Sequence, residues 1–335
     1  MTRVELSLML AVIACDAAFS MTASGGAGGS NSPPAARDAV WRSIFARPQS
    51  VETTPSEDAK VALGFALFRD TRLSGDGTLA CSSCHDPERA FSDGRPKGKA
   101  RDGSALKRNT PSLYNLAASP HFFADGRAAS LEAQARVPIT AADEMAGDFT
   151  LITGRLAADP ETAAKFAAAF PQAPAVSETT LLAALAAYER TLVSPETRFD
   201  RWVAGDDMAL SDQERDGFSL FVGKGGCVGC HGGWRFTDDG FRDIGLPGDD
   251  PGRSALTGGP PDLRQFKTPG LRELTHTAPY MHDGSLATLR DVVNHYAGGF
   301  VKRPSLDSNL VRDLTLVDKE KADLAAFLRT LSSEK

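Results

Sequence analysis

Two Cys-x-x-Cys-His pentads constrain this chain of 335 residues more than any other feature of its sequence. They occupy residues 81–85 and 227–231, and they use four of the five cysteines and two of the six histidines. Two thiols about one helical turn apart can each bond to one vinyl group of a haem, and the adjacent imidazole can then bind the iron. Each pentad therefore predicts one covalently bound haem c. The predicted attachment points are Cys81, Cys84, Cys227 and Cys230, and the predicted axial ligands are His85 and His231.

A Cys-x-x-Cys pair also occurs in redox dithiols and as half of a zinc site. Cysteine and histidine are scarce in this chain, so one such pentad should arise by accident in on the order of one chain in a thousand of this length. Two pentads in one chain therefore favour haem attachment over both alternatives.

The length and the charge limit the class of protein. A chain of this length is long enough for two domains of ordinary size, and one haem in each domain is the simplest arrangement. The net charge is −6, and lysine and arginine are dispersed along the chain. We therefore expect neither a nucleic-acid partner nor a polybasic membrane patch.

The N-terminus predicts export. The apolar run from Leu6 to Ala14 is too short to span a bilayer but has the length of a signal-peptide core, so we expect a signal peptide over residues 1–20 and a periplasmic protein. Cys15 follows a sequence that resembles a lipoprotein processing site, which would make it a lipid anchor, whereas Ala18 to Ser20 form a competing ordinary cleavage site. Residues 21–38 are predicted to be a linker because they are rich in Ser, Gly, Ala and Pro.

A weak internal repeat surrounds the two pentads. Gly-Phe-Ala-Leu-Phe at 64–68 precedes the first, and Gly-Phe-Ser-Leu-Phe at 217–221 precedes the second. Apolar residues elsewhere have helical spacing, notably after Ser177 and near the C-terminus, and strand-like alternation is nearly absent. We predict an all-α fold of two cytochrome c-like haem domains with long loops, packed around an interdomain interface. The predicted domains cover residues 39–195 and 196–335, and the last helix packs either in its own domain or on the first.

The first haem is predicted to have an open iron. From Asp86 to Pro120 there is no histidine and no methionine, so the loop after the first pentad offers no strong sixth ligand. The alternative is that His121, just beyond this loop, moves in and binds the iron.

The segment from Asp125 to Pro138, followed by Asp143-Glu144-Met145, resembles the bacterial di-haem cytochrome c peroxidase family, in particular its MauG-like branch. In that family this segment forms the pocket above the first, peroxide-binding haem. The resemblance implies that Gln134, Pro138 and Glu144 line the pocket and that Glu144 moves protons between the two oxygens of bound peroxide. From the sequence alone, Glu144 would instead be a solvated acid and Gln134 an exposed helix residue.

The second haem has a tyrosine where many relatives have a methionine ligand. The family motif Pro-Tyr-x-His-x-Gly is present at 279–284, and the helix expected from about Leu286 to Ala297 contains no methionine. The resemblance places the ligand at Tyr296. Helical periodicity puts Tyr296 on an apolar stripe and His295 about 100° away from it, on the outer side. The alternative is that Tyr296 is a core aromatic residue and Met281 or His282 binds the iron.

The resemblance also implies a calcium ion between the domains, bound by the side chain of Asn109 and the backbone carbonyls of Thr277 and Pro279. One position departs from the family, because Ala124 stands where a tryptophan commonly lies between the two haems. The remaining candidates for a contact between the haems are Phe122, Phe123, Trp41, Trp202 and Trp234.

Three functions are compatible with two haems. The resemblance favours an enzyme that reacts with hydrogen peroxide, holds both oxidising equivalents as a paired Fe(IV) state and oxidises aromatic residues, most plausibly tryptophan, of a partner protein. The second is a cytochrome c peroxidase that reduces peroxide with electrons from a small cytochrome or cupredoxin. The third is a di-haem electron carrier without catalysis, which the ligand-poor loop after His85 disfavours.

Overall fold

The structure is a computed structural model that describes residues 34–48, 54–310 and 314–334. The predicted signal peptide, Cys15 and residues 21–33 of the predicted linker lie outside the described residues. Helix α1 (Pro34–Phe45) begins inside the range predicted for the linker. The chain divides after Ala39 into two units, and every site described below lies in the second unit, which begins at Val40.

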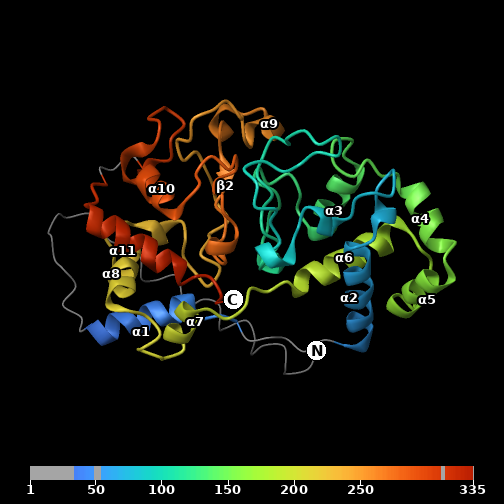
Figure 1. Cartoon of the computed structure of the whole chain (residues 1–335), viewed down its shortest axis with the longest axis horizontal. Coiled ribbons are helices and arrows are strands. Elements are labelled where there is room, and N and C mark those ends of the chain that lie inside the picture. Colours follow the sequence, from blue (N-terminus) through green and yellow to red (C-terminus); the bar gives the residue numbers. More distant parts are fainter. Residues whose placement is uncertain (1–33, 49–53, 311–313, 335) are drawn as a thin grey trace, which may run out of the picture. The chain divides into compact units, whose positions relative to one another are not determined.

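The described residues are mainly helical, as the sequence predicts (Figure 1). The α-helices are α1 (Pro34–Phe45), α2 (Pro55–Phe68), α3 (Leu131–Thr140), α4 (Phe149–Ala157), α5 (Pro160–Ala169), α6 (Glu178–Thr191), α7 (Arg198–Val203), α8 (Asp212–Val222), α9 (Ser254–Thr257), α10 (Leu289–Asn294) and α11 (Asp318–Arg329). The short helical turns are η1 (Thr71–Leu73), η2 (Cys81–Ser83), η3 (Pro87–Arg89), η4 (Leu116–Ala118), η5 (Cys227–Gly229), η6 (Pro260–Asp262), η7 (Leu274–His276), η8 (His295–Gly299) and η9 (Ser308–Leu310). Strands β1 (Phe241–Arg242) and β2 (Phe266–Lys267) form one antiparallel pair.

Local signals explain where two important helices begin. Ser177 accepts a hydrogen bond from the backbone N–H of Thr180, so α6 starts at the cap that the sequence predicts. Thr288 and Asp291 form the same kind of capping box at the start of α10. The predicted start at Leu286 is therefore wrong, and Leu286 instead pairs with Tyr280 in an isolated bridge.

The internal repeat corresponds to two similar helix crossings, α2 on α6 and α8 on α11 (Figure 1). A Cβ atom on Gly64 would lie 2.0 Å from the carbonyl oxygen of Ala184 in α6. A Cβ atom on Gly217 would lie 2.0 Å from the carbonyl oxygen of Asp323 in α11. Glycine is needed at both repeat positions because the helix backbones are in contact there.

Each crossing has its own cluster of buried apolar side chains. The first core cluster surrounds α2 and α6 and includes Leu67 and Leu185, and the second surrounds α8 and α11 and includes Phe218. Phe327 of α11 belongs to the second cluster, so the last helix packs next to α8 and not on the N-terminal half. Phe45 of α1 also packs in the second cluster, although it lies in the range predicted for the N-terminal domain.

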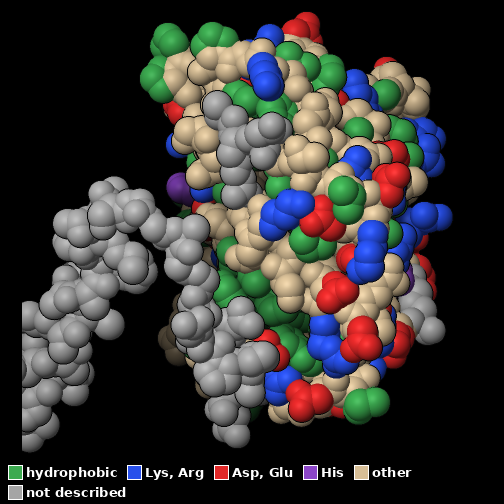
Figure 2. All heavy atoms as spheres, turned by 90° about the vertical axis from the view of Figure 1, so that its left-hand side faces the viewer, with side chains coloured by type: hydrophobic (Ala, Val, Ile, Leu, Met, Phe, Trp, Pro, Cys, Tyr) green, Lys and Arg blue, Asp and Glu red, His purple; other side chains and the backbone are tan. Residues whose placement is uncertain are grey.

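The surface carries charges of both signs. In the view of Figure 2, lysine and arginine side chains alternate with aspartate and glutamate, and no sign dominates the face drawn. Within the described ranges, no helix has both the length and the apolar character needed to cross a bilayer.

Candidate functional site

Both pentads adopt the same turn. In the first, the backbone N–H of His85 donates to the carbonyl of Cys81 at 2.9 Å, and in the second, the N–H of His231 donates to the carbonyl of Cys227 at 2.8 Å. Each turn lies on its core cluster, since Cys81 packs against the first and Cys227 against the second. The sequence repeat therefore gives two matched sites.

The two histidines are held in one tautomer. Nδ1 of His85 donates to the carbonyl of Phe91 at 2.7 Å, and Nδ1 of His231 donates to the carbonyl of Phe236 at 2.8 Å. Burial lowers the pKa of both imidazoles, which favours the neutral form. A neutral imidazole with its Nδ1 proton engaged presents the Nε2 lone pair, which is what an axial haem ligand requires.

The surroundings of the pentad cysteines Cys81, Cys84 and Cys230 do not suit a redox dithiol. Burial raises the pKa of Cys81 to about 12, and burial also raises the pKa of Cys84 and Cys230. Reactive dithiols need a lowered pKa, because the thiolate is the nucleophile. Thiols that stay neutral in an apolar site are compatible with haem attachment, in which each thiol adds to a haem vinyl group and becomes a thioether.

Two of the predicted pocket residues share one face of α3. Gln134 and Pro138 are four residues apart in α3, so they share a face of the helix. The Gln134 side-chain oxygen Oε1 is buried and has no hydrogen-bond partner among the described residues. A buried carbonyl oxygen without a partner is costly, so it fits a position where a bound group or water supplies the missing donor.

The turn after α3 brings Glu144 to the first pentad. The backbone N–H of Met145 donates to the carbonyl of Pro138 at 3.1 Å, which folds the turn back on the helix. The charge of Glu144 raises the pKa of Cys84, so the carboxyl lies near the pentad. Burial, with a smaller effect of Asp143, raises the pKa of Glu144 itself. The structure thus brings Glu144 near the first pentad and its turn against Pro138, with Gln134 one helical turn earlier on the same face of α3.

His121 lies elsewhere. Its ring is 5.6 Å from the ring of Phe241 in β1, so its aromatic neighbour comes from the second half of the chain. This geometry gives no support to His121 as a ligand of the first iron.

Tyr296 lies at the second pentad. Burial raises its pKa strongly, and the nearby Cys227 and Cys230 raise it further, so the phenol is close to both attachment thiols. The residue is part of η8, a π-type turn that continues α10. Turns of this kind inside helices occur frequently at functional sites.

The structure also describes His295 and the two alternative ligands of the second iron, His282 and Met281. His295 is buried, which corrects the expectation that it lies on the outer side, and its Nε2 is 2.8 Å from the carbonyl oxygen of Ile244. The reason is that the loop through Ile244 covers this side of η8. His282 stacks on Phe266 with ring centroids 3.6 Å apart. Met281, the other alternative, has an unusual positive φ of 76°.

The three residues predicted to bind calcium lie in segments that contact each other. The backbone N–H of Asn109 donates to the carbonyl of His282 at 2.8 Å, and its side-chain amide nitrogen donates to the carbonyl of Arg95 at 2.7 Å. The Asn109 side-chain oxygen thus stays available. Neither the Thr277 nor the Pro279 carbonyl accepts a hydrogen bond from a described residue. In the part of the chain that the structure describes, no cluster of three or more His, Cys, Asp or Glu side chains could hold a metal ion.

Around Ala124, the second half of the chain packs against the first. The Ala124 carbonyl accepts a hydrogen bond from the backbone N–H of Lys267 at 2.7 Å. The Phe241 ring lies 2.3 Å from the place where a Cβ on Gly126 would be, so this glycine admits the ring. Phe123 is stacked with the guanidinium of Arg127 at 3.5 Å.

The three tryptophans lie in different surroundings. Trp202 is buried in the second core cluster, and Trp41 packs on the same cluster beside Phe218. Trp234 is half-buried, with the guanidinium of Arg47 at 6.0 Å from its ring.

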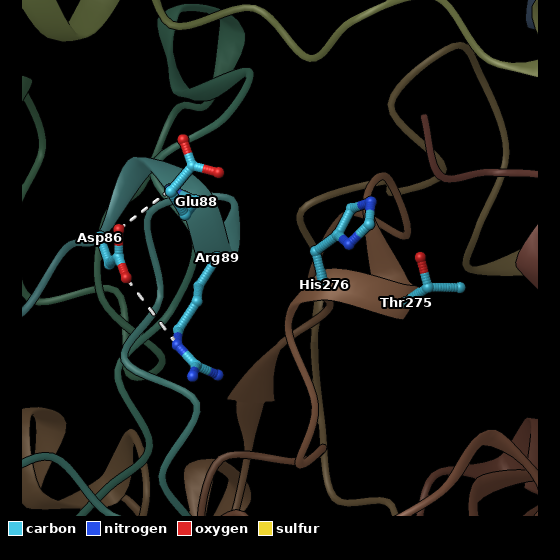
Figure 3. Close-up of a pocket in the computed structure, with 5 residues that line it drawn as sticks. All are labelled: Asp86, Glu88, Arg89, Thr275 and His276. Atoms are coloured by element: carbon cyan, nitrogen blue, oxygen red, sulfur yellow. Dashed lines mark hydrogen bonds and ion pairs between the residues drawn. The ribbon is translucent and has the colours of Figure 1, made fainter. Parts of the chain in front are cut away.

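A polar groove of about 370 Å³ lies between η3 and η7. Figure 3 shows Asp86, Glu88 and Arg89 on one side and Thr275 and His276 on the other. None of the predicted ligands or pocket residues lines it. The groove therefore does not coincide with either haem site.

Glu189 is a site residue that the sequence reasoning missed. It is buried in α6, its Oε2 has no hydrogen-bond partner among the described residues, and its charge raises the pKa of Cys81. A signal was present, because Glu189 continues the apolar stripe of Leu182, Leu185 and Ala186. A carboxyl on such a stripe indicates a buried acid.

The family model for di-haem cytochrome c peroxidase, CCP_MauG, matches residues 58–208. The chain is 44% identical over 333 residues to the methylamine utilization protein MauG of Methylorubrum extorquens, covering 97% of this chain and 94% of that protein. It is 39% identical to cytochrome-c peroxidase IdrP1 of Denitromonas iodatirespirans, covering 83% of this chain and 82% of that protein.

A solved structure has the same fold. The crystal structure of a MauG-like protein associated with microbial copper homeostasis aligns with a TM-score of 0.77 and 33% sequence identity. The alignment covers 92% of this chain and 96% of that one.

Proposed function

Because the chain belongs to the di-haem cytochrome c peroxidase family, we propose that it uses hydrogen peroxide to oxidise aromatic side chains, foremost tryptophan, of a partner protein. It is a MauG-like di-haem enzyme, a haem-dependent oxidoreductase that uses peroxide. Relatives of this kind act with hydrogen peroxide and with a protein partner or an electron donor. The choice of an aromatic side chain as the substrate, and of the periplasm as the location, belongs to the proposal.

The observation that carries the proposal is the position of Tyr296. A phenol at the second pentad, on a helix without methionine, would give the second iron a hard anionic ligand. Such a ligand stabilises the oxidised states of iron and lowers its reduction potential. This haem would be a poor acceptor of electrons from a small cytochrome and a good store of oxidising equivalents.

In this proposal, peroxide reacts at the first pentad. Covalently attached haem would supply the iron that binds peroxide and accepts its oxidising equivalents. Glu144 would take the proton from the near oxygen and deliver it to the departing one, and its half-buried carboxyl with a raised pKa suits this task. The unpartnered oxygen of Gln134 would accept a hydrogen bond from peroxide or water, and Pro138 would limit the space beside it.

Calcium is proposed to connect the two sites. Oxygen donors suit this hard cation, and water would complete its coordination. The Asn109 side-chain oxygen and the carbonyls of Thr277 and Pro279 are such donors without partners among the described residues.

The proposal is tested by adding stoichiometric peroxide to the diferric protein and following its optical and EPR spectra, with and without candidate partner proteins. We expect a long-lived oxidised state in the absence of any donor. In the Tyr296→Phe variant the second haem should change its spectrum and this state should decay at least about tenfold faster, because the anionic ligand is lost. Tyr188→Phe, a change at a tyrosine of the first core cluster, is the matched control.

An unchanged second haem in Tyr296→Phe contradicts the assignment of this ligand. A second candidate function is a cytochrome c peroxidase that reduces peroxide with electrons from a small redox protein, and the 39% identity to IdrP1 favours it. Rapid steady turnover with reduced cytochrome c, and no long-lived oxidised state, would select that function instead.

A further inference from the structure

Glu189 is a buried acid that the peroxide chemistry proposed above does not use. Only 5% of its surface is exposed, and its Oε2 has no hydrogen-bond partner among the described residues. A buried carboxylate without a partner is strongly disfavoured, so the neutral carboxylic acid is the stable form. Burial accordingly raises the pKa of Glu189 to about 8.

The charged neighbours of Glu189 do not neutralise it. Arg190 is next in the chain, but its guanidinium donates to Glu132 of α3 at 2.6 Å. Arg190 therefore lowers the pKa of Glu189 less than burial raises it, and Glu132 raises the pKa further. The third neighbour is Cys81, which cannot ionise once it has become a thioether. The carboxyl of Glu189 is then the titratable group at this place.

Glu189 and Glu144 lie beside different cysteines of the same pentad. The charge of Glu189 raises the pKa of Cys81, whereas the charge of Glu144 raises the pKa of Cys84. Since both thiols are predicted to hold one haem, the two carboxyls would flank different parts of its rim. At the second pentad, the groups that shift the pKa of Cys230 include Arg242, Asp238 and Asp307, which are themselves joined in ion pairs.

We infer that Glu189 is a redox-linked proton group of the first haem site, which holds a proton while the iron is ferrous and releases it when the iron becomes ferric. In the oxidation step of the titration one electron leaves the iron for the electrode through a small redox mediator, and one proton leaves the carboxyl for water. Reduction reverses both transfers. The negative carboxylate compensates the additional positive charge, so the ferric state is stabilised where Glu189 can ionise. This inference rests on the proposed covalent haem at Cys81 and Cys84.

The sign of the pH effect follows from this linkage. The ferric iron attracts the carboxylate, so the pKa of Glu189 is lower in the ferric than in the ferrous protein. Between these two pKa values the reduction potential of the first haem should fall as the pH rises. Each tenfold decrease in proton concentration should lower the potential by up to about 59 mV, the value for one proton per electron.

The test is a spectroelectrochemical titration of the first haem in the intact di-haem protein across this pH range. The wild type should show the pH-dependent potential, and Glu189→Gln should show a nearly constant one. Glu178→Gln is the matched control, because Glu178 is in the same helix but pairs with Arg136 at the surface. The same pH dependence in Glu189→Gln and the wild type would overturn the inference.

A second measurement does not depend on the folding of Glu189→Gln. Oxidised-minus-reduced infrared spectra of the wild type should show loss of a protonated carboxyl band when the first haem is oxidised. The band should persist in Glu144→Gln, which distinguishes Glu189 from the other carboxyl. Absence of any such band overturns the inference. Mass spectrometry that finds no haem on Cys81 and Cys84 would instead contradict the proposed haem site.

Discussion

The two pentads form the same turn on the same kind of helix crossing, but different groups surround them. At the first, two carboxyls with raised pKa values lie nearby, those of Glu144 and Glu189. At the second, the phenol of Tyr296 lies near both thiols. The duplicated part of the chain thus sets where a haem can be attached. The segments that follow each pentad set the chemistry that each haem can perform.

Among substitutions that remove a difference between the two pentads, the one at Glu144 should have the largest effect. Glu144→Gln removes the group that moves protons at the first site, so the reaction with peroxide should slow by about 10²–10⁴-fold. Stopped-flow absorbance after mixing with peroxide measures this rate. Glu161→Gln, which changes an exposed acid paired with Lys165, should react like the wild type. An undiminished rate in Glu144→Gln would remove this residue from the mechanism.

The second prediction concerns stability against pH. In the folded protein the pKa of Glu189 is about 8, above its ordinary value of 4.5. Between these values the folded state binds more protons than the unfolded state, so the free energy of unfolding decreases as pH rises. The decrease should reach up to about 1.4 kcal/mol for each pH unit from this one group.

Chemical unfolding of the reduced, ferrous di-haem protein at several pH values within this window tests that prediction. Glu189→Gln should remove most of the decrease, because glutamine does not ionise. Glu178→Gln, which changes a surface acid of the same helix that pairs with Arg136, should keep the decrease and thereby assign the effect to Glu189. A slope that Glu189→Gln does not alter would show that other groups cause it.

The third prediction tests whether the two scaffolds are equivalent. Gly64→Ala and Gly217→Ala should each destabilise the protein by about 1–3 kcal/mol, because each new methyl group would meet a helix carbonyl at 2.0 Å. Gly154→Ala in α4 is the control, since no atom lies within 4 Å of its Cβ position and alanine favours the helix by up to about 1 kcal/mol. Equilibrium unfolding of all three variants gives the comparison. A large loss at only one crossing would show that the scaffolds are unequal.

The sequence predicted what depends on local signals. The pentads, the Ser177 cap of α6 and the repeated Gly64 and Gly217 lie within short stretches whose spacing indicates their geometry. The all-helical class followed from the same periodicity. The positions of the predicted ligands remain predictions, but the structure places Tyr296 at its pentad and Glu144 at the other.

The failures involve contacts between segments far apart in the chain. His295 was expected outside because periodicity alone cannot show that the loop through Ile244, about fifty residues earlier, covers that side of the helix. The packing of Phe45 next to α8 and α11 depends on residues nearly the whole chain apart. Glu189 was missed for another reason, because the apolar stripe of α6 was followed only through its hydrophobic residues, and the carboxyl that continues the stripe was not included.

The smallest expected effect concerns the connection between the two sites. Asn109 follows the first pentad, and its backbone N–H is bonded to the carbonyl of His282, in the segment that leads to Tyr296. If its side-chain oxygen binds calcium with the carbonyls of Thr277 and Pro279, Asn109→Ala should weaken calcium binding by about tenfold, since one protein ligand is lost while water and the carbonyls remain. Titration of the chelator-treated protein with calcium measures this affinity, and Asn309→Ala, in η9, is the control.

The same ion would join the segment after the first pentad to the segment that leads to Tyr296. Calcium removal should therefore alter the spectra of both haems together. An effect on one haem alone, or an unchanged affinity in Asn109→Ala, would place the ion elsewhere.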